Sequence, residues 1–296
     1  MSASSGPAAG RWRLILLLAP ALLVIGGLFG AGLVTGLVRS LNYMPLIGLT
    51  RPNLDAYRAV LGDPAFGRSF GLTVYIALMS TVISTLIAVP AALLLRRSFA
   101  GRGLVSFLFQ LNLTVPHLVG AIGILVLFSQ SGSFARLGFA AGLIERPDDF
   151  PALVFDPYAI GIILQYVWKE VPFIGLIVLA NLQSIGPEYE SVARSLGANR
   201  IQALTHVLLP LIAPGLAGAA VIVFAFTFGA YEIPLVLGAN APVSLPVLAY
   251  RSYTDVDLAA RPQAMAMAMV IAALSGLMIV LYLWVSRRGQ NWGRTL

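Results

Sequence analysis

The chain has 296 residues, 58% of them hydrophobic and only 10% charged, and its mean hydropathy is +0.88. A soluble core of this size needs far less apolar surface, so the composition excludes an ordinary soluble protein and indicates a polytopic membrane protein. The net charge of +7 comes from basic residues spread beside the apolar runs, so we expect membrane lipid as a partner and no nucleic acid.

The apolar runs predict an all-α fold, a membrane bundle of six transmembrane helices, because about 20 mostly apolar residues cross roughly 30 Å of hydrocarbon. Arg11 and Arg13 precede the first run as in a signal peptide, but this run is too long for one, so we expect it to be retained. We expect one membrane domain over residues 14–288, between tails of residues 1–13 and 289–296. The six runs are Leu14–Val38, Phe70–Leu95, Leu104–Gln130, Tyr158–Leu182, Leu211–Leu237 and Ala264–Val285.

Basic residues at the ends of the runs set the expected orientation. The short loop from Arg96 to Arg102 and the Arg287-Arg288 pair carry positive charge directly beside apolar runs, and such charge resists translocation. We therefore expect both termini, and the loop between the fourth and fifth runs, on the cytoplasmic side. On the outer side, residues 131–157 are predicted to carry a short interfacial helix.

The loop of residues 182–210 is the most informative polar stretch of the chain. Pro187 suits the first turn of a short helix, and Glu188 and Glu190 lie near the positive end of that helix dipole. One apolar stripe follows at helical spacing. Its members are Tyr189, Val192, Ala193 and Leu196.

A glycine separates this helix from a second one. Gly197 is a typical C-terminal stop, and Asn199 with Gln202 three residues later is typical of a capping box for a second short helix before Pro210. Two short amphipathic helices hinged at a glycine favour a docking element, because one face can stay with the membrane domain while the other meets a partner.

This loop resembles a known family signature. The run Ser-Val-Ala-Arg-Ser-Leu-Gly-Ala at residues 191–198, followed by Leu209-Pro210, is similar to the EAA loop of inner-membrane permeases of binding-protein-dependent ABC importers. The family's Glu and first Ala fall on Ser191 and Val192, with Glu190 one place early. Leu49–Leu95 also looks like the family's entry into its second helix.

The resemblance implies a type I ABC importer in the bacterial inner membrane. Such an importer has two permease subunits, two ATPase subunits and a periplasmic solute-binding protein, and its EAA loop supplies the coupling helix that sits in a groove of the ATPase. This chain has no Walker-type phosphate loop, so we expect no enzyme activity, no catalytic residue and no cofactor or metal of its own, with ATP and Mg²⁺ on the partner subunits. The expected coupling residues are Glu188, Glu190, Ser191, Ala193, Arg194, Gly197, Ala198 and Pro210.

Charged residues within apolar runs are candidates for the substrate pathway, because they are costly there. Glu232 with Tyr231 suits a cationic solute, although Glu232 can equally pair with a neighbouring helix. Residues 231–238 are similar to the end of the fifth helix in the polyamine branch of the family, so a polyamine is the expected solute. The other candidates are Trp168, Lys169 and Glu170, of which we expect the last two to reach towards the outer surface.

Several alternatives stay open. The same machinery would serve ferric iron, thiamine or a phosphonate. An ion-coupled secondary transporter would use the buried charges but leaves the hinged loop without a role, and no inverted repeat is visible. An intramembrane enzyme lacks support, because the chain has no cysteine, only two distant histidines and no cluster of acids.

Overall fold

The computed structural model describes residues 7–292, and within that range it contains helices and turns with one isolated bridge between Met44 and Leu49. The predicted all-α class is confirmed. The α-helices are α1 (Pro7–Ser40), α2 (Asp55–Gly62), α3 (Pro64–Arg96), α4 (Arg102–Thr114), α5 (His117–Phe128), α6 (Ser133–Ala140), α7 (Ile160–Ile185), α8 (Glu188–Ser195), α9 (Arg200–Ala203), α10 (Leu209–Gly229), α11 (Glu232–Leu237), α12 (Leu245–Tyr253) and α13 (Arg261–Trp292).

Among the described residues, six helical stretches are long and apolar enough to cross a membrane, as predicted. The expected tails, residues 1–13 and 289–296, lie partly outside the described residues, and helix already begins at Pro7 and continues to Trp292. The six stretches are Leu14–Ser40, Pro64–Arg96, His117–Ala140, Ile160–Ile185, Arg200–Gly229 and Leu258–Trp284.

The third predicted span, Leu104–Gln130, is wrong as a single helix. The chain forms α4 and α5 there, separated at Val115 and Pro116. A proline removes one backbone donor and its ring clashes with the carbonyl of the preceding turn, so the helix ends before it. A short helix is present in residues 131–157 as α6, and its interfacial position stays a prediction.

The fifth predicted span, Leu211–Leu237, also divides. Helix α10 ends at Gly229, and Glu232 is the first residue of the separate helix α11. At the other end, α9 does not stop before Pro210 but continues through a π-helical turn, Leu204–Leu208, into α10. In this wider turn the Leu209 amide bonds to the Leu204 carbonyl, and the helical run passes through Pro210 without a break.

The described chain divides into two compact units, one containing the residues up to Gly62 with Arg251–Met269 and the other containing Asp63–Tyr250 with the chain from Val270 onward. The single membrane domain of residues 14–288 stays a prediction. In the first unit, Ser40 and Tyr57 share a 2.8 Å hydrogen bond, and Gly36 brings α1 close to the Met269 side chain.

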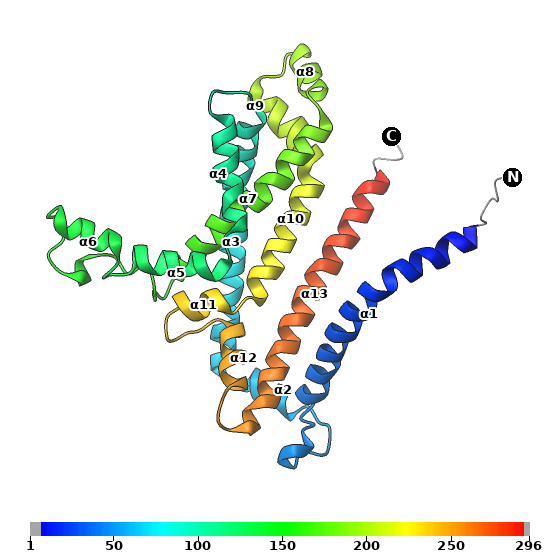
Figure 1. Cartoon of the computed structure of the whole chain (residues 1–296), viewed down its shortest axis with the longest axis vertical. Helices are drawn as coiled ribbons and strands as arrows, with labels where there is room; N and C mark the ends of the chain where they lie inside the picture. Colours follow the sequence, from blue (N-terminus) through cyan, green and yellow to red (C-terminus); the bar gives the residue numbers. More distant parts are fainter. Residues whose placement is uncertain (1–6, 293–296) are drawn as a thin grey trace. The chain divides into compact units, whose positions relative to one another are not determined.

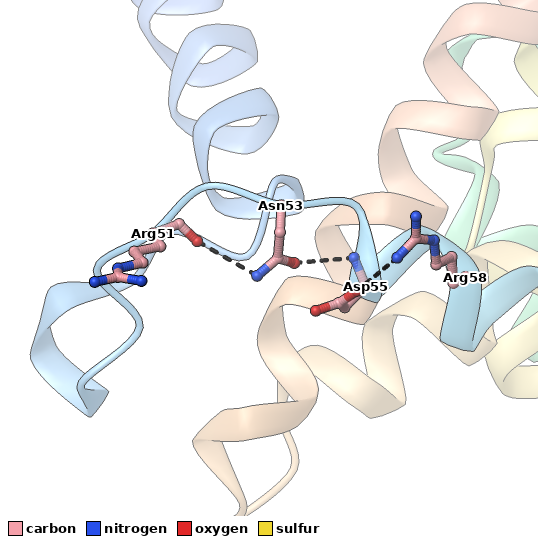
Figure 2. A network of polar contacts seen from close by, with 4 residues as sticks. All are labelled: Arg51, Asn53, Asp55 and Arg58. Carbon is pink, nitrogen blue, oxygen red and sulfur yellow. Dashed lines mark hydrogen bonds and ion pairs between the residues drawn. The ribbon is translucent and has the colours of Figure 1, made fainter.

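A polar turn begins α2 in the first unit. The Asn53 side-chain oxygen accepts from the Asp55 amide at 2.9 Å, and Asp55 accepts from Arg58 at 3.2 Å (Figure 2). Asn53 also donates to the Arg51 carbonyl at 3.4 Å. Both members of the Arg58–Asp55 pair are exposed, so the network defines the start of the helix and adds little to stability.

The second unit is built around α3, α7 and α10. Small residues on α3 let α7 approach closely, and the shared core is aliphatic. Helices α5 and α6 extend sideways from this group (Figure 1), and a second core joins α5 to α7 and α11. The first core includes Ala88, Ala92, Ile174, Val178, Leu182, Ile212 and Val223, and the second includes Ile76, Ala121, Ile162, Tyr166, Ile233 and Leu237.

Gly120 allows α5 and α7 to pack this closely. A Cβ at Gly120 would lie 2.5 Å from Gln165 Nε2 and 2.7 Å from Trp168 Cζ3, whereas a Cβ at Gly123 on the same helix would meet nothing within 4 Å. We predict that Gly120→Ala destabilises the solubilised protein by about 1–3 kcal/mol, because the indole must move. Thermal unfolding measures this effect. Gly123→Ala is the matched control and should be neutral or slightly stabilising; equal melting temperatures for the two variants would contradict the packing described.

Candidate functional site

The loop between α7 and α10 has the predicted helix–glycine–helix shape. Helix α8 ends in a Schellman motif: the Ala198 amide bonds to the Ala193 carbonyl and the Gly197 amide to the Arg194 carbonyl, both at 3.0 Å. Gly197 has a φ of +92°, where a residue with a Cβ is strained. This glycine therefore permits the reversal between α8 and α9.

The second helix of the loop begins with the predicted capping box. The Asn199 side chain accepts from the Gln202 amide, and the Gln202 side chain accepts from the Asn199 amide, both at 2.9 Å. The reciprocal pair satisfies two backbone donors that a helix start leaves open. The chain direction after Gly197 is thus defined by local hydrogen bonds.

Arg96, at the end of α3, anchors the loop. Its guanidinium donates to the Gly186 carbonyl at 2.9 Å and to Glu190 Oε2 at 3.2 Å. The sequence indicated Arg96 only as a basic residue beside a span; its partner lies 94 positions away, so local patterns do not reveal the pair. The Glu190 carboxylate, one place earlier than in the family pattern, holds α8 against the end of α3.

The apolar stripe of α8 faces outward. Only Ala193 is buried, whereas Tyr189, Val192 and Leu196 are 54%, 61% and 84% exposed. The stripe therefore does not pack against the long helices of the chain. The polar bonds of Arg96 hold the loop to α3 instead. A groove of about 400 Å³ runs along the stripe, lined by Glu188, Tyr189, Val192, Ala193, Leu196 and Val207.

The remaining loop residues named from the sequence lie around this face. The Ser191 hydroxyl donates to the Pro187 carbonyl at 3.0 Å. The residue at the family's Glu position therefore makes its hydrogen bond to the start of its own helix. Arg194 is exposed, Ala198 is half-buried, and Pro210 is exposed beyond the π turn.

Lys169 and Glu170 are both buried in α7, so the expectation that they reach the outer surface is wrong. The Lys169 side-chain nitrogen donates to the Asn112 and Val115 carbonyls at 2.7 and 2.6 Å, where α4 ends. The break between α4 and α5 supplies acceptors inside the protein, which removes the need to reach water. The neighbouring Trp168 is partly exposed.

Tyr231 and Glu232 lie at the far end of α10 from the loop of residues 182–210. Both side chains are exposed, and the Tyr231 ring stacks on Tyr250 with centroids 5.1 Å apart. Because α10 has 21 residues at about 1.5 Å each, roughly 31 Å separate its ends, a membrane thickness. The structure therefore keeps the loop residues and the Tyr231–Glu232 pair apart, on opposite ends of one span.

The aromatic residues before this pair divide between packing and surface. Phe228 is buried and meets Phe70 edge-on at 6.2 Å, whereas Phe226 is exposed and lies 4.9 Å from the His117 ring. Among the described residues, no three His, Asp or Glu side chains gather as metal ligands do.

Comparison with known proteins decides the family. Residues 84–290 match the family described as "Binding-protein-dependent transport system inner membrane component". The chain belongs to this family. It is therefore the permease subunit of an ABC importer, a membrane subunit that works with ATPase subunits and a solute-binding protein.

Relatives in this family carry different solutes. The chain is 29% identical to the molybdenum transport permease of Mycobacterium tuberculosis, covering 80% of this chain and 86% of that protein. It is 29% identical to the thiamine transport permease of Brucella suis, covering 79% of this chain and 42% of that protein. Its fold matches a bacterial alginate ABC transporter with a TM-score of 0.78 at 19% identity, covering 94% and 96% of the two chains.

The anchor at Arg96 leads to a local stability prediction. Arg96→Ala should make the α8 amides exchange hydrogen about three- to tenfold faster, because the loop loses two bonds to α3. Hydrogen exchange followed by mass spectrometry over residues 188–195 measures this. The exposed neighbour Arg97→Ala is the control, and equal exchange in the two variants would show that the anchor does not hold α8.

Proposed function

We propose that the loop of residues 182–210 docks on an ATPase subunit and couples ATP hydrolysis to transport. The observation that carries the proposal is the exposed apolar stripe of α8 on a loop anchored at Arg96. Exposed apolar side chains in contact with water are costly, and a patch of this kind marks a partner surface. The rigid Schellman and capping-box turns favour docking without reordering, since little entropy is lost.

The proposed orientation has both termini and this loop in the cytoplasm, with the Tyr231–Glu232 pair on the periplasmic side. The arginines at the loop-side ends of the spans support this orientation. ATP and Mg²⁺ then bind to the ATPase subunits, and this chain binds neither.

A second, non-identical permease and two ATPase subunits complete the proposed importer. Support comes from family membership, because permeases of this family work as parts of importers with several subunits. Six spans form half of a shared pathway in such importers. The native mass of the solubilised complex counts the copies of each subunit.

Leu196 gives the sharpest test of docking. It is 84% exposed, so Leu196→Asp should leave the fold intact but weaken ATPase binding at least about tenfold, because a carboxylate enters an apolar contact. Leu46→Asp is the matched control, since Leu46 is 83% exposed and lies outside the loop. Pull-down of the ATPase and coupled uptake in reconstituted vesicles are the measurements.

The uncoupling variant Gly197→Trp extends the same experiment. At a φ of +92° any side chain strains the turn, so hydrolysis and uptake should separate. Normal ATPase binding by Leu196→Asp together with normal coupled uptake by Gly197→Trp would refute the docking role of the loop.

We propose a small organic cation as the solute, with a polyamine first and thiamine second. Glu232 is exposed next to Tyr231, whose ring stacks on Tyr250. A carboxylate attracts a cation by its charge, and the aromatic rings attract it by their π faces. The thiamine relative supports a cation, and the molybdenum relative makes an oxyanion the outcome that would overturn it.

Uptake of labelled spermidine and of labelled thiamine by the assembled importer tests this assignment. Glu232→Gln keeps the shape and removes the charge, so uptake should fall by about tenfold while the complex still assembles. Glu145→Gln, which changes another exposed acid, is the control and should leave uptake unchanged. Uptake of molybdate in place of both cations, or a Glu232→Gln variant with normal uptake, would show the assignment to be wrong.

A further inference from the structure

Two prolines affect the backbone hydrogen bonds of two neighbouring helices in the second unit, α4 and α7. Pro116 separates α4 from α5, and Pro172 lies inside α7. Because proline has no N–H, the carbonyl four residues earlier loses its helical partner. The carbonyls affected are those of Asn112 on α4, which keeps one bond from the Val115 amide at 3.1 Å, and Trp168 on α7.

Each helix supplies a side-chain donor to the carbonyl that the proline of the other affects. The Lys169 nitrogen on α7 donates to the Asn112 carbonyl at 2.7 Å and to the Val115 carbonyl at 2.6 Å. In return, the Asn112 side-chain nitrogen donates to the Trp168 carbonyl. The break between α4 and α5 and the proline site of α7 are therefore joined by reciprocal bonds. The donors are Lys169 and Asn112, which are 4% and 8% exposed.

The surroundings make these bonds costly to lose. In the hydrocarbon region no water replaces a missing partner, and an unpaired backbone group costs several kcal/mol. Gln165, one turn before Lys169, also donates to the His117 carbonyl at 3.0 Å. Helix α7 thus holds the chain on both sides of the break, before Pro116 and after it.

We propose that Asn112 and Lys169 form a clamp that sets the angle between α4 and the α5–α6 arm, and that Lys169 is a positioning residue and not a solute ligand. The arm extends sideways from α3, α7 and α10, and the break is the joint on which its direction depends (Figure 1). The solute and the ATPase contact take no part in the clamp.

The joint also contains further polar atoms. Among the described residues, buried polar atoms without a hydrogen-bond partner lie on the same residues or beside them. They are Asn112 Oδ1, His117 Nδ1, Gln165 Oε1 and the Tyr166 hydroxyl.

Spin labels measure the joint directly, because the chain contains no cysteine and two can be introduced. Leu104→Cys on α4 and Val126→Cys on α5 are exposed positions on the two sides of the break. In the assembled importer, with cysteine-free partner subunits, pulsed electron spin resonance gives the distance distribution between the labels. The unaltered clamp should give a narrow distribution.

Lys169→Met and Asn112→Leu should each broaden or shift this distribution and lower solute uptake by about tenfold, with the ATPase still bound. Lys169→Arg keeps donors at the joint and should stay close to the unaltered distribution. Thr114→Val is the matched control, since Thr114 bonds only to the Leu111 carbonyl within α4, at 2.7 Å, and its loss should change neither readout.

The proposal is overturned if Asn112→Leu leaves the distance distribution unchanged, or if Thr114→Val disturbs it as much. If Lys169→Met does not assemble, Asn112→Leu alone decides, because it leaves Lys169 in place. The distance readout needs no knowledge of the solute, so it separates failure of the clamp from failure of the proposed transport role.

Discussion

The pairing of backbone carbonyls in the absence of water is the constraint on which this structure depends. The chain has 18 prolines, and several lie inside helices long enough to cross a membrane, where each interrupts a backbone hydrogen bond. Each interruption frees a carbonyl that hydrocarbon cannot solvate. The structure meets this constraint in different ways. A π turn precedes Pro210, the Asn112 side chain on α4 donates to the carbonyl affected by Pro172, and the carbonyl affected by Pro116 accepts from the Val115 amide and from Lys169 on α7.

This constraint changes how the buried polar residues are understood. A charged side chain within a span is first a suspect for substrate binding. Lys169 instead donates a hydrogen bond to a backbone carbonyl of α4, and Asn112 donates one to a backbone carbonyl of α7. Glu232, in contrast, is exposed at the start of α11.

The two ends of α10 separate the two sites proposed above. At one end, α8 and α9 are held by Arg96 while presenting apolar side chains outward. At the other end, α11 carries Glu232 beyond a short break. A continuous helical run from Arg200 to Gly229 connects them, so displacement of the loop can be transmitted along a rigid element. Family membership places the energy source in separate ATPase subunits, and the docking role proposed for the loop agrees with that arrangement.

The sequence by itself determined the class, the number of spans and the shape of the loop. Apolar length, glycine stops and capping boxes act over one or two turns of helix, so they are readable from neighbouring residues: Gly197 and the Asn199–Gln202 pair lie as predicted. Only the tertiary structure decided the partners of Arg96, Asn112 and Lys169, because those partners lie between 54 and 94 positions away in the chain. It also decided that the stripe of α8 faces outward and that the third span is broken. A proline in the sequence predicts which carbonyl loses its helical N–H donor. Which side chain donates to that carbonyl instead depends on how the helices pack.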